Sequence, residues 1–369
     1  ERTPEQTLIL GRDEMRAALA ALPEESRDTL ARAADRIRVF AQAQRDAIQT
    51  TELTIPGGRA GHTVEPVASA GGYAPAGRYP LPSSVLMTAV TARVAGCERV
   101  VVASPGANPV ALAAAAIADA DAFLCVGGAH AIAALAYGFE GFDRCDVIVG
   151  PGNKWVTAAK QLVSGIVGID MLAGPSELLV IADDSADPAT VAADLLAQAE
   201  HDTDAVPMLL TTSPTLANRV EHELADQLVS LSTRDTATSA LANGFACETN
   251  SPDEARVVAD TIAAEHVELL LADPEPFARS LRNAGALFIG HETAEVLGDY
   301  GAGPNHTLPT GGTARFQAGL SVTHFLRLRT WLRIDDAKAA EPLVRDASHL
   351  ARLEGLEGHA KSAEARLTS

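Results

Sequence analysis

The sequence contains few aromatic residues, few basic residues and few cysteines. Aromatic side chains make up 4% of the 369 residues while hydrophobic residues make up 47%, so alanine, valine and leucine must fill the core. Lysine and arginine number 29 against 48 acidic residues, which gives a formal net charge of -19. Because no run of Lys and Arg offers a local basic patch, this balance argues against nucleic acid or an acidic membrane surface as a partner.

The cysteines and the absence of long apolar runs restrict the class of protein further. The 4 cysteines are scattered without a C-x-x-C pair, and three lie in segments that resemble buried strands, which is typical of reduced core thiols. No stretch of about 18 apolar residues could span a bilayer, and the charged, polar N-terminal residues do not resemble a signal peptide. We expect a soluble protein of the cytoplasm or an organelle matrix, long enough for two or more domains.

Helical and strand patterns alternate along most of the chain. Apolar residues recur every three or four positions in residues 12–50, and the segment from Val322 onward is also expected to be mostly helical. Between these segments, helical stretches alternate with short strand-like runs at 99–105, 122–126, 147–149, 178–182, 207–212, 245–248, 267–271 and 287–289. This spacing predicts βαβ units and parallel sheets, whose strand ends and helix N-termini can hold an anionic ligand.

A nucleotide site is suggested by this architecture and not by a motif. The strict G-x-G-x-x-G fingerprint is missing from the sequence. Gly150-x-Gly152 alone is as consistent with a structural turn as with a phosphate-binding loop.

Polar side chains that could share one site occur in three separate runs. Gln198 and His201 lie three residues apart at the end of a predicted helix, so they share one face and could bind one divalent metal such as zinc. Taken alone, a histidine at a helix end is more often a cap or a surface group. The pair Glu265-His266 and the run 298–306 add two further polar clusters to a chain with only 10 histidines. Together the three runs look like parts of one site.

Five separated runs of the sequence resemble the histidinol dehydrogenase family, and the similarity extends from about Pro4 to the C-terminus. The matching runs are Gly150–Lys160, Ile169–Glu177, Leu195–Asp202, Ala264–His266 and Gly298–Gly312. The resemblance implies an NAD-dependent enzyme that oxidises L-histidinol to L-histidine in two steps through a bound aldehyde. This reaction is the last step of histidine biosynthesis.

The resemblance also implies a fold. It consists of two incomplete Rossmann-like domains with parallel-rich sheets and a small helical C-terminal tail domain. We expect the first domain at residues 1–72 and 177–320, the second, on the cofactor side, at 73–176, and the tail at 321–369. In the family the tail crosses to the other subunit of a homodimer, so Glu354 and His359 would serve the partner's active site.

Specific residues are implied for each role in the site. One zinc ion per subunit would be held by Gln198, His201, Asp299 and His359. His266 would be the base for the hydroxyl proton, and Glu265 would activate the water that attacks the aldehyde. The substrate-binding set would be Ser176, Gln198, His201, His266, Asp299, His306, Glu354 and His359. The cofactor-binding set would be Tyr73, His130 and Asn153.

Departures from the family pattern lie on the cofactor side. His130 stands where the family has Gln, Ala76 stands where it has Gly, and the family extends further at the N-terminus. Two alternatives therefore stay open: a related dehydrogenase for another polar alcohol, such as a sulfonated diol, or a zinc- and ligand-binding homologue without redox activity. Taken singly, Glu354 and His359 would be solvated surface and Asp299 a turn residue, and only the joint match assigns them to a site.

Overall fold

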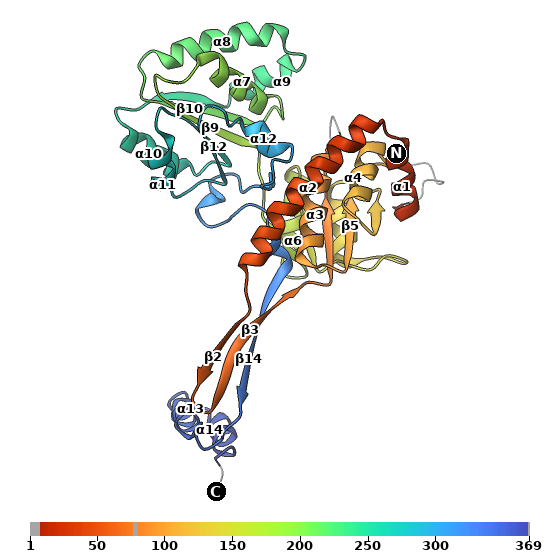
Figure 1. Cartoon of the computed structure of the whole chain (residues 1–369), viewed down its shortest axis with the longest axis vertical. Helices are drawn as coiled ribbons and strands as arrows, with labels where there is room; N and C mark the ends of the chain where they lie inside the picture. Colours follow the sequence, from red (N-terminus) through yellow and green to blue (C-terminus); the bar gives the residue numbers. More distant parts are fainter. Residues whose placement is uncertain (1–7, 77–79, 368–369) are drawn as a thin grey trace. The chain divides into compact units, whose positions relative to one another are not determined.

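Figure 1 shows the computed structural model, which describes residues 8–76 and 80–367 as two compact units. The main unit comprises the residues up to Ala43 together with Val67–Phe325. The tail unit comprises Gln44–Pro66 together with the residues from Leu326 onward. In the described ranges, no helix is both long and apolar enough to cross a membrane.

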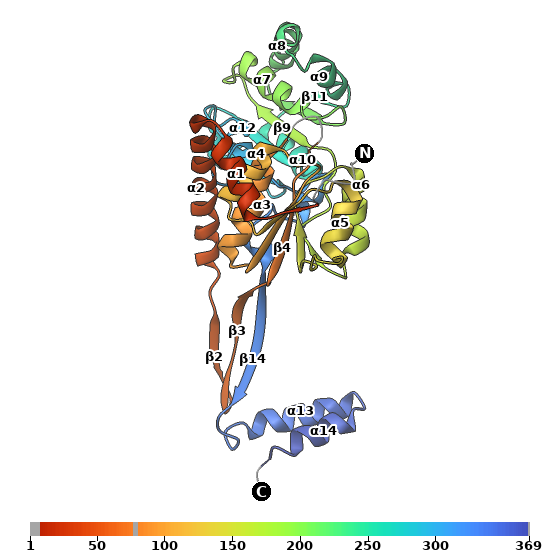
Figure 2. The same ribbon diagram turned by 90° about the vertical axis from the view of Figure 1, so that its right-hand side faces the viewer.

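The first sheet of the main unit has six strands in the order β1-β6-β5-β4-β7-β8. Its strands are β1 (Ile9–Leu10), β4 (Ser69–Tyr73), β5 (Arg99–Ala103), β6 (Ala122–Leu124), β7 (Val147–Val149) and β8 (Gly168–Ile169). Neighbours pair in parallel, except that β1 is antiparallel to β6. The accompanying helices are α1 (Arg12–Ala21), α2 (Glu24–Ala47), α3 (Pro82–Ala95), α4 (Pro109–Ile117), α5 (Gly128–Tyr137) and α6 (Lys154–Val163). In Figure 2, α3 and α4 lie on one side of β4, and α5 and α6 lie on the other.

The second sheet of the main unit has five parallel strands in the order β11-β10-β9-β12-β13. Its strands are β9 (Glu177–Ala182), β10 (Val206–Thr211), β11 (Phe245–Glu248), β12 (His266–Leu270) and β13 (Ala286–Ile289). Its helices are α7 (Pro188–Ala199), α8 (Leu216–Ser230), α9 (Arg234–Leu241), α10 (Pro252–Ile262), α11 (Pro274–Ser280) and α12 (Glu295–Asp299). The expectation of a mixed α/β protein with parallel-rich sheets is confirmed.

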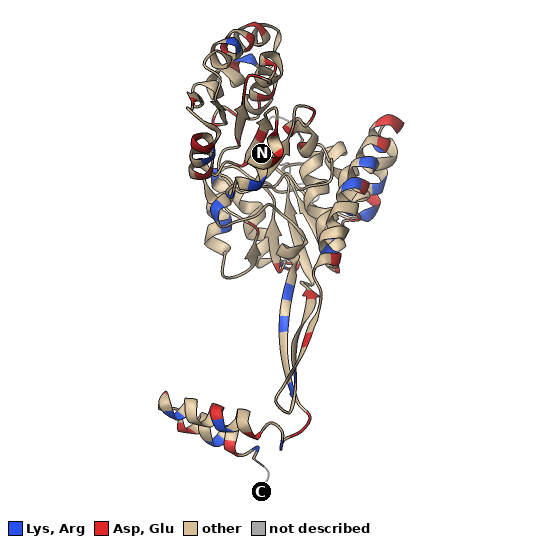
Figure 3. Ribbon diagram, turned by 60° about the vertical axis from the view of Figure 1, so that its left-hand side comes forward, with Lys and Arg blue, Asp and Glu red and all other residues tan. Residues whose placement is uncertain are grey.

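The tail unit combines a three-stranded antiparallel sheet with a helix pair. The strands β2 (Thr51–Ile55), β3 (Gly58–Pro66) and β14 (Leu326–Ile334) pair in the order β14-β3-β2. The helices are α13 (Glu341–Leu353) and α14 (Glu357–Glu364), and two 3-10 turns, η1 (Thr313–Arg315) and η2 (Val322–Phe325), precede β14. Figure 3 shows acidic and basic residues interspersed along α2, α13 and α14, so these helices carry mixed charge.

The segment from Val322 was expected to be mostly helical, and this expectation is wrong for its first part. Residues Leu326–Ile334 form β14, which pairs with β3 along its whole length. Leucine and arginine alternate through this run, and a period of two is the pattern of a strand and not of a helix. Strands β2, β3 and β4 were also missed, because glycines such as Gly71 and Gly72 made the region look like a loop.

The residues expected to form the first domain are distributed differently in the structure. Residues 1–72 were grouped with 177–320, whereas here β1 and β4 pair within the first sheet and β2 and β3 belong to the tail unit. The division into three domains itself stays a prediction.

A buried ion pair fixes the turn that follows β7. The ammonium of Lys160 on α6 contacts the carboxylate of Asp170, and their side chains are 3% and 0% exposed. Lys160 Nζ also donates to the Gly150 carbonyl oxygen at 3.0 Å, and the Gly150 amide donates to Asp170 Oδ2 at 2.7 Å. Gly150 has φ +115° and a Cβ there would lie 2.1 Å from the Tyr73 carbonyl oxygen, so only glycine fits. The pair therefore holds the Gly150–Asn153 turn in place.

Replacing Asp170 by alanine is expected to lower the free energy of unfolding by about 3–5 kcal/mol, because it leaves the Lys160 ammonium buried without a counter-charge. Urea denaturation followed by circular dichroism measures the loss. The control is Glu341→Ala, which breaks an exposed ion pair with Arg345 and should cost less than about 1 kcal/mol. Equal losses in the two variants would contradict a structural role for the buried pair.

Candidate active site

Two neighbouring strands of the second sheet begin beside the residues predicted to transfer protons. β12 starts at His266, with Glu265 just before it, and pairs in parallel with β9, which starts at Glu177. The Nδ1 atom of His266 lies 3.0 Å from the backbone carbonyl oxygen of Glu177. Because a carbonyl oxygen can only accept, Nδ1 carries the proton and donates it, which leaves Nε2 as the basic nitrogen.

Burial keeps the His266 imidazole neutral. The removal of the ring from water lowers its pKa to about 4, although the nearby Asp299 carboxylate acts in the opposite direction. Its Nε2 atom has no hydrogen-bond partner among residues 8–76 and 80–367. The ring is therefore a neutral base whose accepting nitrogen is available to a ligand.

Glu265 is held by two hydrogen bonds to a single carboxylate oxygen. Its Oε2 accepts from Ser176 Oγ at 2.7 Å and from the Glu177 amide at 2.9 Å. Burial raises the pKa of Glu265 well above its ordinary value, and the hydrogen bonds from Ser176 and Glu177 oppose that shift. A carboxyl group with a raised pKa can take and return a proton near neutral pH.

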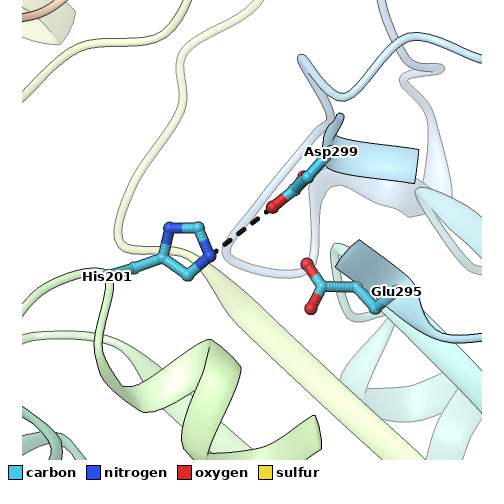
Figure 4. Close-up of side chains that lie close together, drawn as sticks. All are labelled: His201, Glu295 and Asp299. Atoms are coloured by element: carbon cyan, nitrogen blue, oxygen red, sulfur yellow. Dashed lines mark ion pairs between the residues drawn. The ribbon is translucent and has the colours of Figure 1, made fainter. Parts of the chain in front are cut away.

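Three potential metal ligands converge next to His266 (Figure 4). One atom each from His201, Glu295 and Asp299 lie within 4.8 Å of one another. His201 comes just after α7, and its Nε2 lies 3.5 Å from Oδ2 of Asp299 at the end of α12. Glu295, at the start of α12, has its Oε1 3.6 Å from Nε2 of His266. Imidazole and carboxylate groups are typical zinc ligands.

Buried polar atoms without partners show that these residues fit a metal ion. Gln198, one helical turn before His201 on α7, is 0% exposed, and neither atom of its amide is hydrogen-bonded within the described chain. Both carboxylate oxygens of the buried Glu295 also lack a hydrogen-bond partner among the described residues. Such atoms are costly to bury unless something binds them. An amide oxygen, an imidazole and carboxylates together suit a divalent metal such as zinc.

A cavity of about 220 Å³ adjoins the cluster. Its polar lining includes His266, Asp299 and His306, and its apolar lining includes Phe288 and Leu297. His306 Nδ1 donates to the Asp299 carbonyl oxygen at 2.9 Å, and its Nε2 lies 3.2 Å from Ser84 Oγ on α3. The cavity therefore offers an apolar wall together with titratable groups, the usual composition of a small-molecule site.

A second pair of buried carboxyl groups joins α7 to β12. Glu268 and Asp194 are 1% and 9% exposed and lie close enough for each to shift the pKa of the other. Burial raises the pKa of both, and the nearby Asp194 carboxyl group raises that of Glu268 further. Two carboxyl groups in this arrangement share a proton near neutral pH.

The residues expected to contact a cofactor lie at the carboxyl ends of strands in the first sheet. Tyr73 ends β4, and its hydroxyl accepts a hydrogen bond from the Gly128 amide at 3.0 Å, at the start of α5. Asn153 caps α6, accepting from the amides of Trp155 and Val156. His130 is an exposed residue of α5. Their roles toward a cofactor stay predictions.

The main unit contains most of the residues predicted for catalysis, substrate binding and metal binding. These are Ser176, Gln198, His201, Glu265, His266, Asp299 and His306. The remaining two, Glu354 at the end of α13 and His359 on α14, are exposed residues of the tail unit.

Sequence reasoning missed four residues of this region. Glu295 lies four residues before Asp299, and that spacing on a helix was the available signal. Glu268 lies two positions after His266 in a strand. Side chains two positions apart point to the same face, so the sequence could have placed Glu268 on the same face as the buried His266. Asp194 and Ser84 carried no signal of their own, since their partners are distant in the sequence.

Comparison with known proteins identifies close relatives. The family model for histidinol dehydrogenase matches residues 2–367. Histidinol dehydrogenase of Thermus thermophilus is 47% identical over 353 residues, which cover 95% of this chain and 85% of that protein. The enzyme of Dechloromonas aromatica is 45% identical over 366 residues, which cover 98% of this chain and 84% of that protein. The crystal structure of histidinol dehydrogenase from Elizabethkingia anophelis has a TM-score of 0.93 at 34% identity, covering 98% of this chain and 84% of that one.

A more distant likeness concerns the fold alone. Betaine aldehyde dehydrogenase from Staphylococcus aureus matches with a TM-score of 0.55 at 13% identity over 88% of this chain. The paired Rossmann-like architecture is thus shared with aldehyde dehydrogenases, whose sequences differ.

Glu268→Gln is expected to flatten the pH dependence of stability in the metal-free protein. Because folding raises the pKa of Glu268, its contribution to stability is complete below the ordinary value of 4.5 and declines as pH rises toward the raised value. The glutamine has no proton to lose, so melting temperatures should fall less steeply from about pH 5 to 9 than in the wild type.

The matched control is Glu221→Gln, which removes an exposed carboxylate on α8 and should keep the wild-type slope. A wild-type slope in the Glu268→Gln variant as well would show that no proton is held at this position.

Proposed function

The chain belongs to the histidinol dehydrogenase family, and on this premise we propose that it oxidises L-histidinol to L-histidine with NAD, in two steps through a bound aldehyde. The observation that carries this proposal is the geometry around His266. Its free Nε2 lies beside a cluster of potential metal ligands next to a cavity of about 220 Å³. A neutral base, a raised-pKa carboxyl and a metal site in contact are the groups that such an oxidation requires.

The metal proposed is one zinc ion per subunit. Gln198, His201 and Asp299 of the main unit would hold it, and the partner subunit's His359 would complete the set. When bound, the ion would supply a Lewis acid that favours loss of the substrate's hydroxyl proton. The orphaned amide of Gln198 and the mixed nitrogen and oxygen donors support this assignment.

His266 is assigned as the base in the first step. Nε2 takes the hydroxyl proton of the substrate while the carbon bearing that hydroxyl gives a hydride to NAD, which yields NADH and the aldehyde. The hydrogen bond from Nδ1 to Glu177 fixes the ring for this transfer, and the lowered pKa keeps Nε2 unprotonated beforehand.

Glu265 is assigned to the second step. Its carboxylate takes a proton from the water that adds to the aldehyde, and the resulting hydrate gives a second hydride to NAD to form the carboxylic acid. The hydrogen bonds from Ser176 and Glu177 keep Oε2 in position, and burial provides the raised pKa that this exchange requires. His306 and Ser176 would contact the substrate.

The cofactor is proposed to bind at the carboxyl edge of the first sheet. There the turns after β6 and β7 open α5 and α6, whose amides can hold the NAD phosphates. Tyr73, His130 and Asn153 surround these turns, and His130 in place of the family's glutamine leaves a polar side chain at its position.

A homodimer is proposed in which tail units are exchanged between active sites. The partner subunit's Glu354 would bind the substrate ammonium, while the partner subunit's His359 binds the metal. Support comes from apolar side chains exposed on the tail unit itself: Leu328, Leu332, Leu350 and Leu353 are 58–70% exposed. Exposed apolar surface of this extent is typical of an interface.

We also assign the protein to the cytoplasm, where thiols such as Cys97 and Cys145 remain reduced.

With zinc and NAD, the purified protein is expected to release two NADH per L-histidinol, measured by absorbance. His266→Asn should lower kcat by roughly 10²–10⁴-fold, because Nε2 is lost as a base. The control is His222→Asn on α8, whose ring contacts the carbonyl of Asn218 in its own helix and should not matter.

Two results would contradict the proposal and identify the alternatives. A folded protein that is inactive on histidinol but active on another polar alcohol in a substrate panel would be a related dehydrogenase. A protein that produces no NADH, while histidinol raises its melting temperature only with zinc, would be a binding protein.

Tail exchange predicts that two inactive variants restore each other. In a hybrid dimer of His266→Asn with His359→Ala, one site would combine an intact main unit with an intact partner tail, so mixed subunits should recover roughly a quarter of wild-type activity. A hybrid of His266→Asn with Gln198→Ala, both in the main unit, is the control and should stay inactive. No recovery in the first mixture would show that each tail serves its own chain.

A further inference from the structure

Glu295 is a buried acidic residue that none of the roles above uses. Its side chain is 1% exposed, and neither carboxylate oxygen has a hydrogen-bond partner in the part of the chain described here. Burying a carboxylate is strongly unfavourable unless a cation or several donors compensate it. Burial raises the pKa of Glu295 to about 8, and protonation alone would still leave both oxygens without a hydrogen-bond partner among the described residues.

The surroundings of Glu295 indicate which partner would satisfy these oxygens. Its carboxylate, the imidazole of His201 and the carboxylate of Asp299 each place one ligand atom within 4.8 Å of the other two (Figure 4). Glu295 and Asp299 are four residues apart on α12, so both side chains lie on one face of the helix. Three groups at this separation can coordinate a single ion.

We propose that Glu295 is a ligand of the metal ion in the substrate-free enzyme, together with His201 and Asp299. This inference rests on the zinc site of the proposed function and adds a residue to it. An ion that binds substrate must have positions open to it, and without substrate a neighbouring carboxylate can fill one of them.

The neighbouring orphaned amide is an independent observation in favour of a ligand here. Gln198 lies on α7, which packs against α12, and its fully buried amide is likewise without a partner among the described residues. A single ion would satisfy the amide oxygen and the carboxylate together, whereas His266 Nε2, 3.6 Å from Glu295 Oε1, is itself an acceptor and donates no hydrogen bond to it.

The test is zinc affinity of the substrate-free protein, measured by titration calorimetry on chelator-treated protein reloaded with zinc alone. Glu295→Gln keeps the shape of the side chain and removes its charge, and it should weaken zinc binding roughly tenfold or more. The matched control is Glu268→Gln, another buried carboxyl in this region but outside the cluster, which should bind zinc as the wild type does.

A crystal structure of the zinc-loaded wild type without substrate provides a second measurement that requires no variant. It should place one Glu295 carboxylate oxygen about 2.0–2.2 Å from the ion. Wild-type affinity in Glu295→Gln, or both oxygens more than about 3 Å from zinc, would overturn this inference and leave the proposed function intact. Failure of the wild type to bind zinc would overturn both.

Discussion

The hydrogen bond between His266 Nδ1 and the Glu177 carbonyl oxygen is the contact on which the rest of the site depends. It depends on the parallel pairing of β9 and β12, in which His266 lies opposite Leu178, the residue after Glu177. A shift of one residue in that register would turn His266 to the other face of the sheet. The same register brings the Glu177 amide and Ser176 within reach of Glu265. One strand pairing therefore sets the tautomer of the imidazole and the environment of the carboxyl group.

In the proposed function, the two sheets of the main unit contribute opposite edges to the chemistry. The first sheet offers the carboxyl ends of β4 and β7, the usual ligand edge of an open parallel sheet. The second sheet instead offers the amino ends of β9 and β12. The C-terminal end of α7 and the short helix α12 lie beside them. The loop that contains Asn305 and His306 connects the second-sheet side to α3 of the first-sheet side. His306 contacts Ser84, and Asn305 donates a hydrogen bond to the Met87 carbonyl oxygen at 2.9 Å. Substrate and cofactor can thus be bound by different sheets of one compact unit.

Sequence reasoning predicted what depends on local pattern and missed what depends on long-range pairing. The helix at 188–199 and the strand at 147–149 were predicted at their observed bounds, because apolar periodicity alone determines them. The alternating Leu and Arg of β14 have the period of a strand, but its partner β3 lies far back in the chain, so the pairing itself could not be read from the local pattern.

The same division applies to the site. Gln198, His201 and Asp299 could be selected from their residue types and motifs, whereas the importance of Glu295 and Glu268 depends on their burial, which their weak sequence signals do not show. A carboxylate in a sequence gives no sign of whether it is solvated, and acidic residues are numerous in this chain. The raised pKa of Glu265 likewise follows from its surroundings and not from its neighbours in the sequence.

The pairing of β3 with β14 also determines the order in which the chain can be completed during synthesis. Gly58 pairs with Ile334, so the whole second part of the main unit, Val67–Phe325, is inserted between the two strands. The hairpin of β2 and β3 emerges early from the ribosome, and its third strand follows only after both Rossmann-like sheets have been made. Until then β3 has an unpaired edge, which is the kind of surface that associates wrongly with other chains. The tail unit is therefore the last part of the chain to form.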